Sequence, residues 1–205
     1  NLYFVYPRSN NQVFKNFNFK IKAKKINILL GPSGSGKSTL AKILLKLYPY
    51  DIGSITFGEY ELKFIDPIKL RDKIYYCNQK TVLFNQSIMT NIQFGNQAST
   101  TIIKKYLQDY QLIDNFKQIS FNLDYSCGIN GSNLSMGMQK IIIILRAICK
   151  KDKDIFIFDE PLSGLDQTTR QRVVKLITKE LKGKTILIIT HDLDFNKYSN
   201  NINYL

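Results

Sequence analysis

Apolar and polar positions alternate in two ways along the chain. Residues 2–6 and 13–21 place an apolar side chain at nearly every second position, which is the period of antiparallel strands. Three lysines interleave with apolar residues over 19–24, and this predicts that the lysines form the solvated face of one strand. Residues 54–62 predict a second antiparallel segment.

Continuous apolar runs alternate with helical patterns in the rest of the chain. We expect buried strands at residues 26–30, 73–77, 155–158 and 185–190, and a strand-like run at the polar end that reaches Leu205. Helices are predicted at residues 38–47, 134–149 and 167–181, with short helices and polar joints over 86–122. Strands that alternate with helices predict an α/β fold, a mostly parallel sheet with helices on both faces.

A glycine-rich segment lies between the first buried strand and the first helix. It fits the pattern G-x-x-x-x-G-K-[ST]. Glycines let the backbone curl so that successive N–H groups point at phosphate oxygens, and the following helix adds its positive end. We expect Lys37 to hold the β- and γ-phosphates and the Ser38 hydroxyl to ligate Mg²⁺. The other residues expected around the nucleotide are Gly31, Pro32, Ser33, Gly34, Ser35, Gly36 and Thr39.

Polar residues end two of the predicted strands. Asp159 and Glu160 follow four apolar residues, and His191 follows the strand at 185–190. Because parallel strands end at the edge where the phosphate loop lies, we expect these side chains to face the nucleotide. Asp159 fits the Mg²⁺ shell, Glu160 fits the general base that polarises the attacking water, and His191 fits a role at the γ-phosphate. The alternatives are a plain turn cap for Asp-Glu and a surface or core position for the histidine.

The amino-acid composition limits the classes of protein to which the chain can belong. The chain has 205 residues, 44% of them hydrophobic, which suffices for one domain with a core. Its net charge is +13, but lysine outnumbers arginine 24 to 5, which argues against a protein that reads bases by bidentate contacts. The abundance of isoleucine, asparagine and lysine is typical of an AT-rich codon bias, and this interpretation of the excess charge needs no anionic partner. No run reaches the roughly 20 apolar residues of a membrane helix. The three cysteines lack CxxC spacing, which argues against a disulfide framework or a zinc site.

In combination, these motifs resemble the nucleotide-binding domain of ATP-binding cassette (ABC) transporters over nearly the whole chain. Gln79 stands where that family has its Q-loop glutamine, and residues 134–138, Leu-Ser-Met-Gly-Met, stand where it has its LSGGQ signature. Residues 163–166 resemble the D-loop, and His191 resembles the switch histidine. Tyr6 resembles the aromatic residue that stacks on adenine, with plain strand core as the alternative. Residues 51–58 and 70–92 resemble the exporter branch in particular.

The resemblance implies a P-loop NTPase fold with an N-terminal antiparallel β subdomain and an inserted α-helical subdomain. Residues 1–78 and 150–205 would form the ATP-binding core, and residues from about 79 to 149 the helical subdomain, within a single nucleotide-binding domain over 1–205 cut from a longer chain. It further implies that ATP and Mg²⁺ drive transport from the cytoplasmic face of a membrane. The membrane domains would lie upstream or on another chain.

The resemblance also assigns roles to individual residues. Glu160, His191 and Lys37 would be catalytic, and Gln79 would ligate Mg²⁺ beside Ser38 and Asp159. Two such domains, identical or different, pack head to tail in this family. Ser135, Gly137 and Asp166 would therefore act on the ATP held by the partner domain.

Some positions depart from the family pattern. Met136 and Met138 replace a glycine and the glutamine of the signature, and Ile129 replaces a glutamate that exporters often carry before it. Ile141 and Ile143 replace polar or small residues, and we expect them to be buried. These changes predict ATP binding with slow turnover in a homodimer. Two other functions stay open: a soluble ABC ATPase acting on nucleic acid or the ribosome, and an ATP-binding regulatory module with little turnover.

Overall fold

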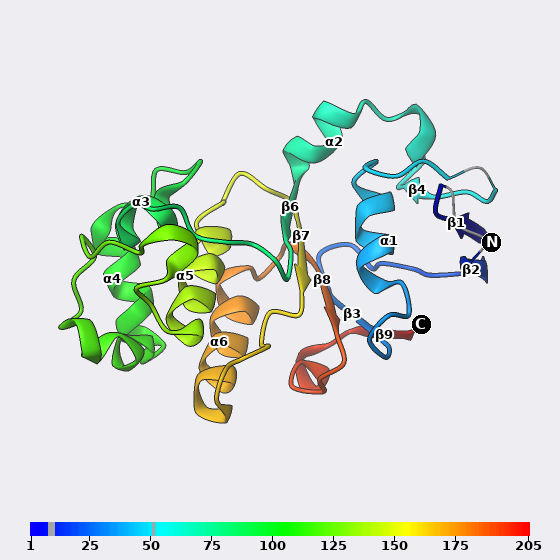
Figure 1. The fold of residues 1–205 in the computed structure, drawn as a ribbon. Coiled ribbons are helices and arrows are strands. Elements are labelled where there is room, and N and C mark those ends of the chain that lie inside the picture. The colour runs from blue at the N-terminus through cyan, green and yellow to red at the C-terminus, as the bar shows by residue number, and fades with distance from the viewer. Residues whose placement is uncertain (8–10, 51) are drawn as a thin grey trace.

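The computed structural model describes residues 1–7, 11–50 and 52–205, so Asp51, at the start of one exporter-like stretch, lies outside it. A parallel sheet runs through the centre of the molecule (Figure 1). Among the described residues, its strands lie in the order β6-β7-β8-β3-β9 and pair in parallel. Their bounds are β3 Ile26–Leu30, β6 Ile74–Cys77, β7 Ile155–Asp159, β8 Thr185–Thr190 and β9 Asn201–Tyr204. The predicted buried strands are confirmed, and the strand-like end of the chain is the edge strand β9.

Side chains of the central strands alternate between two hydrophobic cores. Leu29 and Ile157 point to the core that contains α1, whereas Ile28 and Phe156 point to the core that contains α5 and α6. The three helices are α1 Lys37–Leu44, α5 Met136–Ile148 and α6 Gln167–Glu180. A strand that is covered on both faces needs apolar residues at every position, which explains the continuous runs in the sequence.

Antiparallel strands lie beside α1, at the side of the molecule opposite the helices α3–α6 (Figure 1). β1 (Leu2–Val5) pairs with β2 (Gln12–Phe17), and β4 (Thr56–Phe57) pairs with β5 (Tyr60–Glu61). The strand predicted over 19–24 is wrong, because β2 ends at Phe17. The Asn27 side chain accepts a hydrogen bond from the Lys22 N–H (2.7 Å) and donates one to the Lys22 carbonyl (3.0 Å). These backbone groups are therefore satisfied without a strand partner.

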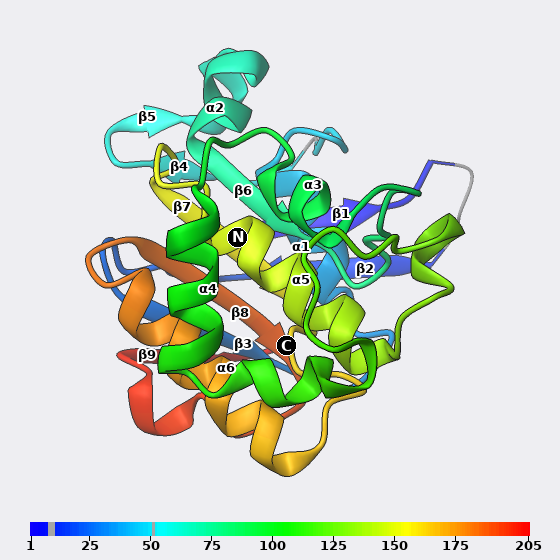
Figure 2. The same ribbon diagram turned by 90° about the vertical axis from the view of Figure 1, so that its left-hand side faces the viewer.

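A layer of helices covers the outer side of α5 (Figure 2). It contains α3 Ile88–Gln93, α4 Thr100–Asp109 and the 3₁₀ segments η2 Leu112–Ile119 and η3 Ile129–Gly131. The short helices expected over 86–122 are confirmed. Ile141 and Ile143 are buried in α5, as expected. The remaining short elements are η1 Leu62–Phe64, α2 Pro67–Lys73 and η4 Asn196–Tyr198.

A buried asparagine holds this helical layer to α5. Asn91 is 0% exposed, and its side-chain oxygen accepts hydrogen bonds from the Phe84 N–H (2.8 Å) and from Arg146 Nη2 (2.9 Å). Its amide nitrogen donates to the carbonyls of Phe84 and Ser87.

Within the described ranges, no helix combines the length and the hydropathy that crossing a membrane requires.

Candidate nucleotide-binding site

The predicted site residues come from neighbouring strand ends at one edge of the sheet. β8 lies between β3 and β7, and the register sets Leu30 opposite Thr190 and Asp159 opposite Ile189. The loop after β3 is the glycine-rich segment, β7 ends in Asp159, and His191 follows β8. The topology therefore brings these motifs to the carboxyl edge, where ligands of α/β sheets bind.

The phosphate loop is shaped by its glycines and by Lys37. Gly36 precedes α1 with φ of 102°, and a Cβ there would lie 2.6 Å from Val13 Cγ1, so only glycine fits. Lys37 is 7% exposed, and its Nζ donates to the carbonyls of Gly31 (2.7 Å) and Pro32 (2.8 Å). The hydroxyl of Ser35 is buried and has no hydrogen-bond partner among the described residues. The loop thus holds a cation and an unsatisfied hydroxyl, both of which suit a phosphate.

Two oxygen groups at this edge fit a hard cation. Asp159 is 4% exposed, and its Oδ2 accepts a hydrogen bond from the Tyr76 hydroxyl at 3.1 Å. Among the described residues, neither Asp159 Oδ1 nor the Ser38 hydroxyl makes a hydrogen bond. A carboxylate and a hydroxyl oxygen are ligands that Mg²⁺ accepts. Their fit supports the predicted roles, which stay predictions.

Glu160 is held in a strained and highly connected position. Its φ is 51°, which is uncommon for a residue with a side chain. Its carbonyl accepts hydrogen bonds from Ser163 Oγ (3.1 Å) and Lys140 Nζ (3.4 Å). Its carboxylate accepts one from the Thr190 hydroxyl at 3.2 Å, and His191 Nδ1 lies 2.9 Å from its Oε1. Backbone and carboxylate are both fixed, so the side chain is oriented before any ligand arrives.

His191 is coupled to this carboxylate. The hydrogen bond that His191 donates to the Glu160 carboxylate raises the pKa of His191 above its ordinary value, and the nearby charges of Glu160 and Asp192 act in the same direction. Lys37 opposes them. The imidazole side chain is 63% exposed, so the histidine can reach a ligand from the edge of the site. It is the chain's only histidine.

The signature residues lie at the start of α5. Ser135 caps this helix by accepting a hydrogen bond from the Met138 N–H at 3.2 Å. Met136 is 73% exposed, whereas Met138 is 2% exposed. The Met136 methyl group lies against Gly164, at 3.3 Å from the place where a Cβ would stand. The signature and the D-loop are therefore neighbours in this chain.

The remaining predicted residues have plain structural surroundings. Asp166 caps α6, because its carboxylate accepts hydrogen bonds from the backbone N–H (3.0 Å) and the hydroxyl (2.6 Å) of Thr169. The Tyr6 hydroxyl lies 2.6 Å from Thr39 Oγ1, and its ring packs edge-on against Phe4. Gln79 is exposed in the loop after β6. Adenine stacking by Tyr6 and Mg²⁺ ligation by Gln79 stay predictions.

Sequence reasoning missed several residues of this network. Tyr76 reaches Asp159 from the neighbouring strand β6, and Lys140 reaches the Glu160 carbonyl from α5. No local sequence pattern indicates such contacts, because they join residues from separate elements. Thr190 could have been found, because it is a polar residue that ends a buried strand next to the histidine.

A glycine-rich phosphate loop between a strand and a helix, with an acidic strand end at the same edge of a parallel sheet, defines a P-loop nucleoside triphosphatase. The family model described as "ABC transporter" matches residues 14–163. The chain therefore belongs to the ABC transporter family, as the nucleotide-binding domain, and it shares that family's ATP-binding and ATP-hydrolysing fold.

Known proteins point to the exporter branch. The chain is 33% identical over 205 residues to "ATP-binding cassette sub-family B member 10, mitochondrial" of Mus musculus, covering 98% of this chain and 28% of that protein. It is 34% identical over 195 residues to an "ATP-dependent lipid A-core flippase" of Pseudomonas fluorescens, covering 94% and 32%. A bacterial Atm1-family ABC exporter with ATP bound has a similar structure, with a TM-score of 0.89 and 27% identity over 100% of this chain and 36% of that one. The chain thus spans about a third of these relatives' length.

Proposed function

We propose that this domain hydrolyses Mg-ATP to drive an exporter-type transporter. The observation that carries the proposal is the Glu160 carboxylate, held by Thr190 and His191 at the edge of the sheet where the phosphate loop lies. A fixed carboxylate beside a phosphate-binding loop can take a proton from a water molecule that attacks the terminal phosphate.

The residues of this chain then divide the work. Lys37 exchanges the carbonyls of Gly31 and Pro32 for phosphate oxygens, and the loop N–H groups bind beside it. Glu160 orients water and accepts its proton, and His191 moves from Glu160 toward the γ-phosphate. Ser38, Asp159 and Gln79 would hold Mg²⁺, which neutralises phosphate charge.

The partner surfaces follow from the exposed start of α5. A helix N-terminus binds anions, so Ser135 and the Gly137 N–H are suited to the γ-phosphate held by a second nucleotide-binding domain. Asp166 would contribute from the adjacent D-loop. The helical subdomain, residues 79–149, would contact transmembrane domains of the same or another chain, which sets the ATP-binding core on the cytoplasmic face.

Turnover is slow in this proposal, because Met136 puts an exposed side chain where the phosphate and the partner loop must approach. The same observation favours a second function, an ATP-binding module with little turnover. Single-turnover cleavage with protein in excess over Mg-ATP separates the two. Cleavage supports the hydrolytic engine, binding without cleavage supports the module, and a folded protein that leaves Mg-ATP unbound contradicts both.

A further inference from the structure

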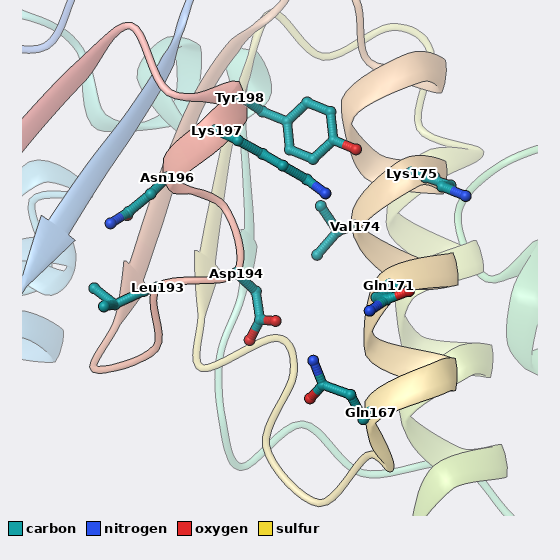
Figure 3. Close-up of a pocket in the computed structure, with 9 residues that line it drawn as sticks. All are labelled: Gln167, Gln171, Val174, Lys175, Leu193, Asp194, Asn196, Lys197 and Tyr198. Carbon is teal, nitrogen blue, oxygen red and sulfur yellow. The ribbon is translucent and has the colours of Figure 1, made fainter.

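A fork of ion pairs joins the first turn of α6 to the loop that carries His191. Arg170 Nη2 contacts Asp192 Oδ2, and its Nη1 lies 3.5 Å from Asp194 Oδ2. The side chains of Arg170, Asp192 and Asp194 are only 21%, 17% and 19% exposed. An arginine between two carboxylates, largely shielded from water, fixes geometry more firmly than a surface pair does. Asp194 also lines a cavity of about 500 Å³ between this loop and α6. Figure 3 shows Asp194 on the loop side of this cavity and Gln167 on the side of α6.

The loop end of this fork is connected to the candidate base. The Asp192 N–H donates to Thr190 Oγ1 at 3.0 Å, and that hydroxyl donates to Glu160 Oε2 at 3.2 Å. Asp192 Oδ1 also lies 3.9 Å from His191 Nε2. Asp192 therefore contacts both of the groups that contact the Glu160 carboxylate.

The helix end of the fork is connected to the D-loop. Asp166 is the cap of α6, and the Arg170 N–H donates to the Asp166 carbonyl at 2.9 Å. Arg170 thus stands one turn after the D-loop residue that is expected to meet a partner domain. A shift of the D-loop carries Arg170 with it, because both belong to the first turn of one helix.

We propose that Arg170 is a positioning residue that holds the loop after β8 so that His191 meets Glu160, and that it links the D-loop to the chain's own ATP site. The link to ATP rests on the proposed function. The positioning itself concerns the free protein and can be tested without nucleotide.

The single histidine makes this test direct. An NMR titration of the His191 ring in the free protein reports its pKa without assignment ambiguity. The charged groups that act on the ring are Glu160, Asp192 and Lys37, with Arg170 behind Asp192. Removing the Arg170 charge alone would raise the pKa of His191. Releasing the loop would separate His191 from Glu160 and lower the pKa toward the ordinary 6.5.

The variant Arg170→Met removes the fork and keeps the aliphatic stem. We expect the pKa of His191 to fall toward its ordinary value, because its contact with Glu160 loosens. Arg172→Met is the matched control, since Arg172 lies on the same helix but contacts Asp114 and Gln111. It should leave the pKa unchanged. An unchanged or raised pKa in Arg170→Met overturns the proposal.

Arg170→Lys keeps the charge and should show a smaller fall, and it replaces Arg170→Met if that variant does not fold. The kinetic arm is the steady-state hydrolysis of Mg-ATP. We expect Arg170→Met to lower kcat about fivefold with KM unchanged, because Arg170 acts on the switch loop and not on the nucleotide. A rise in KM with kcat unchanged contradicts the link. If the wild-type protein fails to cleave ATP, the proposed function is contradicted. The titration still decides whether Arg170 positions His191, because it is done without nucleotide.

Discussion

The two regions of this chain that we propose to act on ATP are built differently. At the carboxyl edge of the sheet, Lys37, Asp159 and Glu160 are all buried, and each makes hydrogen bonds to other parts of the chain. At the start of α5, Met136 is 73% exposed, and the Ser135 hydroxyl accepts only a hydrogen bond from its own helix among the described residues. The side chains of the first region are held by contacts within the chain, and the second region presents an exposed surface.

This difference separates two kinds of contribution. Groups that are already oriented lower the barrier to chemistry without reorganisation, whereas an exposed surface contributes only when a partner covers it. Changes at the sheet edge should therefore alter binding or chemistry in the free domain. Changes at the start of α5 should alter only the events that need a second domain.

Among the changes at the sheet edge, we expect Glu160→Gln to have the largest effect. The amide has nearly the shape of the carboxylate but cannot accept the proton of water, so we expect single-turnover cleavage to fall about a thousandfold. ATP affinity, measured with a fluorescent analogue, should stay within about twofold, since in our proposal Lys37 and the loop N–H groups, and not Glu160, bind the phosphates. Glu59→Gln, at an exposed position before β5, is the control. Undiminished cleavage in Glu160→Gln would show that another group is the base.

Asn91→Ala tests whether Asn91 holds α5, the helix that presents the exposed signature residues, firmly in place. The change leaves Arg146 and the Phe84 N–H without their buried acceptor, so the free energy of unfolding should fall by about 3 kcal/mol. Urea denaturation measures it, with the exposed Asn85→Ala as the control. A loss no larger than that of the control would mean that α5 is not held through this residue, and that the surface it presents is loosely placed.

Lys37→Met tests whether the Lys37 side chain binds the phosphates of ATP at the sheet edge. Charge-assisted hydrogen bonds to phosphate contribute about 2 kcal/mol, so ATP affinity should fall about thirtyfold in a titration of the free domain. Lys42→Met, on the same helix, removes a lysine that lies over the Tyr48 ring, and it should leave affinity unchanged. Equal affinity in both variants would place the phosphates away from Lys37.

The same contrast explains what could be read from the sequence. Motifs of consecutive residues, such as the phosphate loop and Asp159-Glu160, predicted where the sheet edge lies, because local order and parallel topology determine it together. The contacts that hold Asn91, Tyr76 and Arg170 join residues far apart in the chain, and no spacing encodes them. The strand at 19–24 was mispredicted for a different reason: the nearby Asn27 side chain bonds the N–H and carbonyl of Lys22, and the alternation of apolar residues does not reveal this.

Met136→Ala tests the exposed surface. Alanine keeps the helix propensity and removes the bulk over Gly164, so we expect steady-state turnover at high protein concentration to rise about threefold. Affinity for ATP in the free domain should not change, because in our proposal Met136 lies at the nucleotide that a partner domain holds. Met136→Leu retains the bulk and is the control. Equal rates for the two variants would show that the methionine does not limit turnover.

The smallest expected effect is on how the free energy of unfolding of the free protein depends on pH. Glu160 raises the pKa of His191 in the folded state, so the stabilisation from this pair is fully present below the ordinary histidine pKa of 6.5 and is lost as the pH rises through the raised value. Solvent screens an imidazole that is 63% exposed, which limits the effect to a few tenths of a kcal/mol. Urea denaturation should therefore show a larger difference between wild type and His191→Gln at a pH of about 5.5 than at about 8.5. The opposite order would mean that the protonated ring is not paired with Glu160, and it would remove the most exposed contact from the hydrogen-bond network around Glu160.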